Sequence, residues 1–122
     1  MPSEPILIVD DNPANLKLAR LLLTAEGHDA RTAPDAESAM KLLETFKPKL
    51  ILMDIQLPGM DGLELTRALK ANPATRHIVI VALTAYAMRG DEAKARAAGC
   101  DDYIAKPYSP RQMLAKVREI LG

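Results

Sequence analysis

The chain of 122 residues has the length of one domain, and 48% of its residues are hydrophobic, enough for a single core. Sixteen basic residues balance sixteen acidic ones without a run of like charge, which argues against binding to nucleic acid or to an anionic membrane. The sequence has no apolar stretch near the ~20 residues that span a bilayer, no signal peptide pattern, and one cysteine, Cys100. We therefore expect a single cytoplasmic domain over residues 1–122 whose partners are proteins or small ligands.

Short apolar runs alternate with longer stretches of helical periodicity along the whole chain. This alternation is typical of βα units on a parallel sheet, and it predicts an α/β fold. The strong runs are continuous rather than alternating, so we expect helices on both faces of their strands, whereas the weaker second run suggests an edge strand. The predicted strands cover residues 5–10, 29–32, 49–54, 77–83 and 101–105.

Five helices are predicted between and after these strands. Asn12 can cap the first helix with Pro13 at its first position, and Asp61 with Glu64 resembles a capping box at the start of the third. The fourth helix, roughly 88–98, is Ala-rich and weakly amphipathic, so its packing should be the loosest. Apolar residues recur at helical spacing in the first, second and last helices: Leu16, Ala19, Leu22 and Leu23; Ala36, Ala39, Met40 and Leu43; Met113, Leu114, Val117, Ile120 and Leu121.

Polar residues follow the predicted strands at their carboxyl ends. Right-handed crossovers bring these ends to one edge of a parallel sheet, which receives Asp10, Asp11, Asp54, Thr84 and Lys106. Three carboxylates that converge repel one another unless a cation lies between them. All candidate ligands are oxygens and no His or Cys cluster is nearby, so Mg²⁺ with several waters fits better than zinc.

The same set of side chains is suited to phosphoryl transfer. A carboxylate such as Asp54 can attack a phosphoryl group to give an aspartyl phosphate, and this reaction needs a metal and a further cation. Lys106 supplies the cation, and the Thr84 hydroxyl can hydrogen-bond a phosphoryl oxygen. The buried strand would hold Asp54 rigid, while the Pro58-Gly59 turn leaves it open to a donor.

Four motifs resemble one known family. "VDDN" at 9–12, "MDIQLPGMDG" at 53–62, "LTA" at 83–85 and "KP" at 106–107 look like the receiver domain of bacterial two-component response regulators. The resemblance covers the whole chain and is greatest to single-domain regulators of the polar-differentiation (DivK) type. It implies a doubly wound (βα)5 fold, flavodoxin-like or CheY-like, with a parallel five-stranded sheet of order 2-1-3-4-5 and helices on both faces.

The resemblance also implies roles for individual residues. Asp54 would accept a phosphoryl group from a histidine kinase or a phosphotransfer protein, in a signalling domain that is not an enzyme beyond assisting its own phosphorylation and slow dephosphorylation. Mg²⁺, with Mn²⁺ able to substitute, would be held by carboxylates and one backbone carbonyl: Asp10, Asp11, Asp54 and the carbonyl of Gln56. Lys106 would grip the phosphoryl group, and its peptide bond to Pro107 would be cis.

Phosphorylation is expected to change the face made by the fourth helix, the fifth strand and the fifth helix. Thr84 and Tyr103 would switch this face, and Tyr86, Met88 and Arg89 would contribute to it. A downstream protein would bind there, and the chain would be a monomer or a weak dimer. The sequence leaves open which kinase and target it serves, and whether it is a complete regulator or part of a larger protein.

Three other functions are weighed against this one. A flavin-binding module of the same fold would need a Ser/Thr/Gly-rich loop after the first strand, where this chain has "DDNPAN". A phosphohydrolase of the haloacid dehalogenase type would carry a second Asp two residues after the nucleophile, where this chain has Gln56. A receiver-like domain that binds partners without phosphorylation usually lacks an acid or the lysine, and none is lost here.

Overall fold

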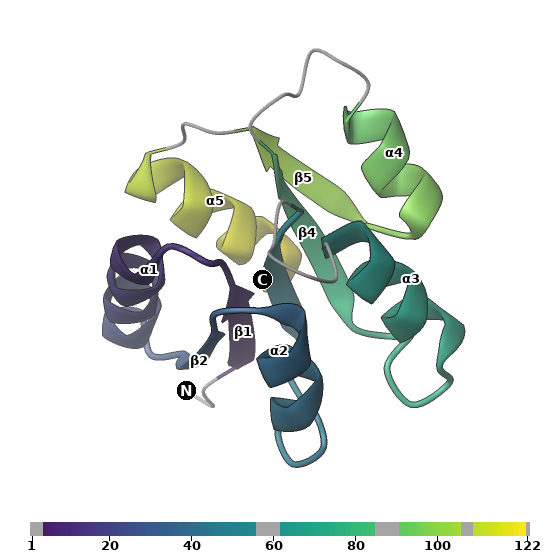
Figure 1. The fold of residues 1–122 in the computed structure, drawn as a ribbon. Helices are drawn as coiled ribbons and strands as arrows, with labels where there is room; N and C mark the ends of the chain where they lie inside the picture. Colours follow the sequence, from purple (N-terminus) through teal and green to yellow (C-terminus); the bar gives the residue numbers. More distant parts are fainter. Residues whose placement is uncertain (1–3, 56–61, 85–90, 106–108, 122) are drawn as a thin grey trace.

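A computed structural model describes residues 4–55, 62–84, 91–105 and 109–121. Strands and helices alternate along these residues (Figure 1), as the apolar runs predict. The elements are β1 (Pro5–Val9), α1 (Pro13–Ala25), β2 (Asp29–Ala33), α2 (Ala36–Leu42), β3 (Leu50–Asp54), α3 (Gly62–Ala71), β4 (Val79–Thr84), α4 (Asp91–Ala98), β5 (Asp102–Ala105) and α5 (Pro110–Leu121).

The strands form one parallel sheet of order β2-β1-β3-β4-β5. This confirms the predicted fold and strand order. Within the described residues β2 pairs with β1 alone, so it is the edge strand that its weak apolar run suggests. All carboxyl ends of the strands therefore lie along the same edge of the sheet.

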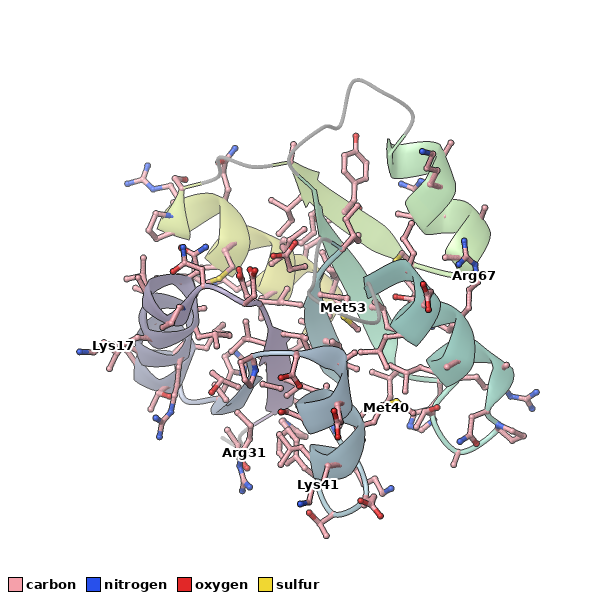
Figure 2. The ribbon with its side chains drawn as sticks, in the orientation of Figure 1. Lys17, Arg31, Met40, Lys41, Met53 and Arg67 are labelled. Carbon is pink, nitrogen blue, oxygen red and sulfur yellow. The ribbon has the colours of Figure 1, made fainter. Side chains whose placement is uncertain are left out.

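Helices cover both faces of the sheet. α1 and α5 lie on one side and α2, α3 and α4 on the other (Figure 1). Alternate residues of each central strand enter opposite cores: Leu50 and Leu52 pack with α1 and α5, whereas Ile51 and Met53 pack with the other three helices. Figure 2 labels Met53 in this interior position. Every residue of β3 is buried, which explains why its sequence is a continuous apolar run.

The predicted helix signals hold where the structure describes them. Asn12 caps α1: its side-chain oxygen accepts from the backbone N–H groups of Ala14 at 2.9 Å and Asn15 at 3.3 Å, and Pro13 is the first helical residue. Gly99, with φ of 110°, follows the end of α4. The predicted capping residue Asp61 and the expected start of the fourth helix lie outside the described residues. In the described part of the chain, no helix has the length and apolar character needed to cross a membrane.

Four predicted strands differ from the observed ones by one residue at one end, and two further details of the prediction differ more. Met40 is 43% exposed, because the short helix α2 meets the core through Ala39 and Leu43 and leaves Met40 on its flank. The fourth strand begins at Val79 rather than at residue 77. The N–H of Ile78 donates to the backbone carbonyl of Thr75 at 3.1 Å, so Ile78 still belongs to a turn.

Candidate functional site

Asp54 is the last residue of β3 and is 4% exposed. The register pairs Asp54 with Leu83 of β4, and the next N–H, that of Ile55, donates to the Leu83 carbonyl at 3.3 Å. β4 pairs with β3 on one side and β1 pairs with it on the other, so the end of β3 that carries Asp54 is held between two strands. A carboxylate at this position has little freedom to move with its backbone.

Gly62 brings the start of α3 against the end of β3. Its N–H donates to the Ile55 carbonyl at 3.2 Å, and a Cβ on it would lie 2.3 Å from the backbone oxygen of Asp54. The Thr66 hydroxyl donates to the Gly62 carbonyl at 2.8 Å, and the Cys100 sulfur lies 3.7 Å from that hydroxyl. Cys100 is buried, and burial raises the pKa of its thiol. The close approach of α3 to the end of β3 requires glycine at position 62. This requirement is not among the sequence-based predictions, although a glycine at the start of a helix could have indicated it.

Asp10 and Asp11 follow β1 at the same edge. Val9 pairs with Met53, so the next residue in the same register, Asp10, lies beside Asp54. The N–H of Asp10 donates to the Ala33 carbonyl of β2 at 3.2 Å. Asp10 is 1% exposed, whereas Asp11 is exposed. The two acids thus reach the site from a buried and an open position.

The three carboxylates form one cluster. Each offers an oxygen, and the oxygens of Asp10, Asp11 and Asp54 all lie within 4.8 Å of one another. Ligands on opposite sides of a Mg²⁺ ion are about 4 Å apart, since each Mg–O distance is ~2.0–2.1 Å. The oxygen donors and their spacing therefore fit a magnesium ion that keeps several waters. This convergence was predicted from the strand ends.

Among the described residues, Asn12 and Asn15 contact the carboxylate of Asp10. Its Oδ1 accepts from the N–H of Asn12 at 2.9 Å, and its Oδ2 accepts from the side-chain amide of Asn15 at 3.4 Å. Both donors belong to the start of α1. Asn12 is predicted from the sequence as a cap, whereas no role is predicted for Asn15, because a contact between residues five apart depends on the direction of the helix.

The other predicted site residues lie at the ends of β4 and β5. Thr84 ends β4, and its backbone is paired with that of Ala105, the last residue of β5. Lys106 follows Ala105 in the sequence. The remaining predicted residues lie outside the described part of the chain, so their roles and the cis peptide stay predictions: Gln56, Tyr86, Met88, Arg89, Lys106 and Pro107.

Tyr103 lies in the middle of β5 between α4 and the core. Its side chain is partly buried and packs against the core on the side of α2, α3 and α4. The guanidinium of Arg96, in the last turn of α4, lies over its ring at 5.8 Å from the centroid. This distance is within the range of a cation–π contact. The ring therefore links β5 to α4.

An ion pair joins β5 to α5. Lys116 Nζ lies 2.9 Å from Asp102 Oδ2. Partial burial opposes ionisation of Asp102, but hydrogen bonds from Lys116 and from the N–H of Tyr103 outweigh it and lower the pKa of Asp102. The hydrogen bond to Asp102 raises the pKa of Lys116. Both groups are therefore charged over a wider pH range than in a free side chain.

Comparison with known proteins identifies relatives over nearly the whole chain. The pattern of the response regulator receiver domain matches residues 6–118. The polar-differentiation response regulator DivK of Brucella anthropi is 43% identical over 117 residues, which cover 96% of this chain and 95% of that protein.

Solved structures resemble the fold closely. The receiver domain of a sensor histidine kinase from Pseudomonas aeruginosa, with a magnesium ion coordinated in its active site cleft, is 33% identical with a TM-score of 0.87, covering 97% of both chains. The chemotaxis response regulator CheY4 of Vibrio cholerae shares the fold with a TM-score of 0.92 at 22% identity, covering 98% of this chain and 99% of that one.

Proposed function

The chain belongs to the family of response regulator receiver domains, and from this premise we propose that Asp54 is the residue that accepts the phosphoryl group. Domains of this family are phosphorylation-dependent switches of two-component signalling. The observation that carries the proposal is the cluster of three carboxylates in which Asp54 ends a fully buried strand. Membership of this family also separates the chain from the flavin-binding and dehalogenase-type alternatives.

The proposed transfer is a substitution at phosphorus. An oxygen of Asp54 forms a bond to phosphorus while the P–N bond to the imidazole of the donor breaks, and the bonding pair returns to the imidazole nitrogen. A bound Mg²⁺ would neutralise charge on the phosphoryl oxygens. Lys106 would provide a second cation for them, and the Thr84 hydroxyl would donate a hydrogen bond to one of them.

The proposed metal ligands are Asp10, Asp11, Asp54 and the backbone carbonyl of Gln56. The oxygen donors favour Mg²⁺, and Mn²⁺ can substitute because it accepts the same ligands. The magnesium ion in the related receiver domain from Pseudomonas aeruginosa supports this assignment. The buried Asp10 and the exposed Asp11 would each offer the ion one oxygen.

The domain is a signalling domain, and we propose that it performs no catalysis beyond its own phosphorylation and slow dephosphorylation. Gln56 stands where a phosphohydrolase of the dehalogenase type carries an acid, and an amide cannot act as a general base toward water. The phosphoryl group would therefore persist long enough to be recognised by another protein.

We propose that the output surface is the face made by α4, β5 and α5. Thr84 and Tyr103 would switch it, with Tyr86, Met88 and Arg89 beside them, and a downstream protein would bind there. The partly buried ring of Tyr103, in contact with α4, supports this choice. The phosphoryl donor would be a histidine kinase or a phosphotransfer protein.

The remaining proposals concern the state of the chain. Residues 1–122 would act as one receiver domain, as a monomer or a weak dimer, and in the cytoplasm. A single buried free cysteine is compatible with a reducing compartment.

The test is phosphorylation by a small donor. Incubation with acetyl phosphate and Mg²⁺ should add one phosphate that hydroxylamine removes, as expected for an acyl phosphate, and Asp54→Asn should abolish the addition. Asp29→Asn is the control, because Asp29 starts β2 at the opposite edge of the sheet and pairs with Arg31. Phosphate that persists in the Asp54→Asn protein, or that is found on Ser, Thr or Tyr, would contradict the proposal.

A further inference from the structure

Asn15 is the third residue of α1, and its side chain is directed back toward the site. Its backbone N–H already donates to the capping oxygen of Asn12 at 3.3 Å. Its side-chain nitrogen lies 3.4 Å from Oδ2 of Asp10. Because an ionised carboxylate can only accept, the amide group of Asn15 is the donor in this contact.

The contact is important because Asp10 is nearly sealed from water. Asp10 is 1% exposed, and a buried polar group is costly unless it is hydrogen-bonded. Asn12 donates to one oxygen and Asn15 to the other, both from the first turn of α1. A rotation of the carboxylate would break both contacts, so this turn contributes to the direction in which the Asp10 carboxylate points.

We propose that Asn15 is a positioning residue for the metal site and acts through Asp10. The inference rests on the proposed binding of Mg²⁺ by Asp10, Asp11 and Asp54. A neutral amide suits this role, because it orients one of three crowded carboxylates without bringing a cation that would compete with the metal. In this proposal Asn15 itself would contact neither the metal nor the phosphoryl group.

Two substitutions separate hydrogen bonding from shape. Asn15→Leu keeps nearly the same shape and removes the donor, whereas Asn15→Gln keeps the amide on a longer side chain. Leu and Gln both favour a helix more than Asn does, so a loss of helix propensity would not explain any weaker binding. Thr24→Ala is the control, since Thr24 is an exposed, neutral residue near the other end of α1.

The measurement is the dissociation constant for Mg²⁺ by calorimetry, without any phosphoryl donor. Asn15→Leu should weaken binding about tenfold, at the low end for residues that orient a metal ligand. Asn15→Gln should recover part of this loss, and Thr24→Ala should bind as the wild type does. Unchanged affinity in Asn15→Leu would overturn the proposal, and so would equal losses in the Leu and Gln variants, because an amide donor at this position would then make no difference.

A metal-free measurement keeps this inference separate from the proposed function. If the wild type binds no Mg²⁺, the proposed metal site fails. The contact is then tested by hydrogen exchange at the N–H of Asn12, which donates to the same carboxylate. Faster exchange in Asn15→Leu than in Thr24→Ala would support the positioning of Asp10 by Asn15, and equal exchange in the two variants would overturn it.

Discussion

Lys70 Nζ and Asp101 Oδ2 lie 2.8 Å apart and join α3 to the turn before β5. The same nitrogen donates to the backbone carbonyls of Arg76 at 3.1 Å and Ile78 at 2.7 Å. The same carboxylate oxygen accepts from the N–H of Ile80 at 2.9 Å. The pair therefore fixes both the entry to β4 and the entry to β5, at the edge of the sheet opposite the acidic cluster.

Replacement of Lys70 by Met should destabilise the domain. Lys70→Met keeps most of the aliphatic chain and removes three hydrogen bonds from a side chain that is 19% exposed. We expect a loss of about 1.5–3 kcal/mol in the free energy of unfolding, the usual contribution of a hydrogen bond to a charged group. Urea denaturation measures it, with Lys17→Met as control, because Lys17 is exposed and points outward from α1 (Figure 2). Equal stability of the two variants would refute this role.

Gly62→Ala should impair both stability and phosphorylation. The new Cβ would lie 2.3 Å from the Asp54 carbonyl oxygen, so α3 or the end of β3 must shift, at a cost of about 1–3 kcal/mol. The displaced Asp54 should then react more slowly with acetyl phosphate. Gly27→Ala is the matched control: Gly27 has φ of 94° with open space around its Cβ position, so it should lose about 1–2 kcal/mol yet be phosphorylated normally. Similar phosphorylation rates in both variants would be evidence against the role of Gly62.

Asp11→Asn should weaken binding of Mg²⁺ by about tenfold or more, because the affinity of an oxygen site depends on the number of its charged ligands. Asp11 is the exposed member of the cluster, so the substitution should leave folding intact. Chemical shifts during a Mg²⁺ titration measure the effect, with Asp29→Asn as control. Unchanged affinity would remove Asp11 from the metal site.

The Asp102–Lys116 pair should make stability depend on pH at both extremes. The pKa of Asp102 is lowered on folding. Its stabilisation of the fold is therefore fully present at pH values above its pKa in the unfolded chain, and it is lost as the pH falls through its pKa in the folded protein. The pKa of Lys116 is raised on folding. Its stabilisation of the fold is therefore fully present at pH values below its pKa in the unfolded chain, and it is lost as the pH rises through its pKa in the folded protein. The pair is partly exposed, and we expect a coupling of only about 0.2–1 kcal/mol at neutral pH.

A double-mutant cycle with Asp102→Asn and Lys116→Met measures this coupling. The coupling energy should disappear in acid and decrease at high salt. A coupling that is equally large at neutral and at acid pH would contradict the assignment.

Arg96→Ala should favour the activated arrangement of the proposed output face. The guanidinium lies over the ring of Tyr103, and this contact contributes about 0.5–1 kcal/mol to the resting position of the ring. Its loss should move amide chemical shifts around β5 partway toward those seen with beryllofluoride, even before activation. Lys94→Ala is the control, since Lys94 is exposed on the same helix. If both variants give the same spectrum, Arg96 does not restrain the ring.

The sequence was sufficient to predict the sheet and the acidic cluster, because both depend on where apolar runs end. Asp54 follows four apolar residues, and a parallel sheet brings that position beside the residue after β1. Gly62 and Asn15 were missed for a different reason. Their roles depend on how closely a helix approaches the end of a strand, and no periodicity in the sequence records that distance. The exposure of Met40 likewise depends on the short length of α2.

The position of β2 at the edge of the sheet also bears on aggregation. An edge strand offers unpaired backbone groups to a strand from another chain. β2 has only five residues, and two of them, Asp29 and Arg31, are charged and paired with each other at 3.3 Å. The guanidinium of Arg31 also lies 4.7 Å from the centre of the Phe46 ring. A strand added at this edge would have to displace these charges, so the sheet resists growth by strand addition on this side.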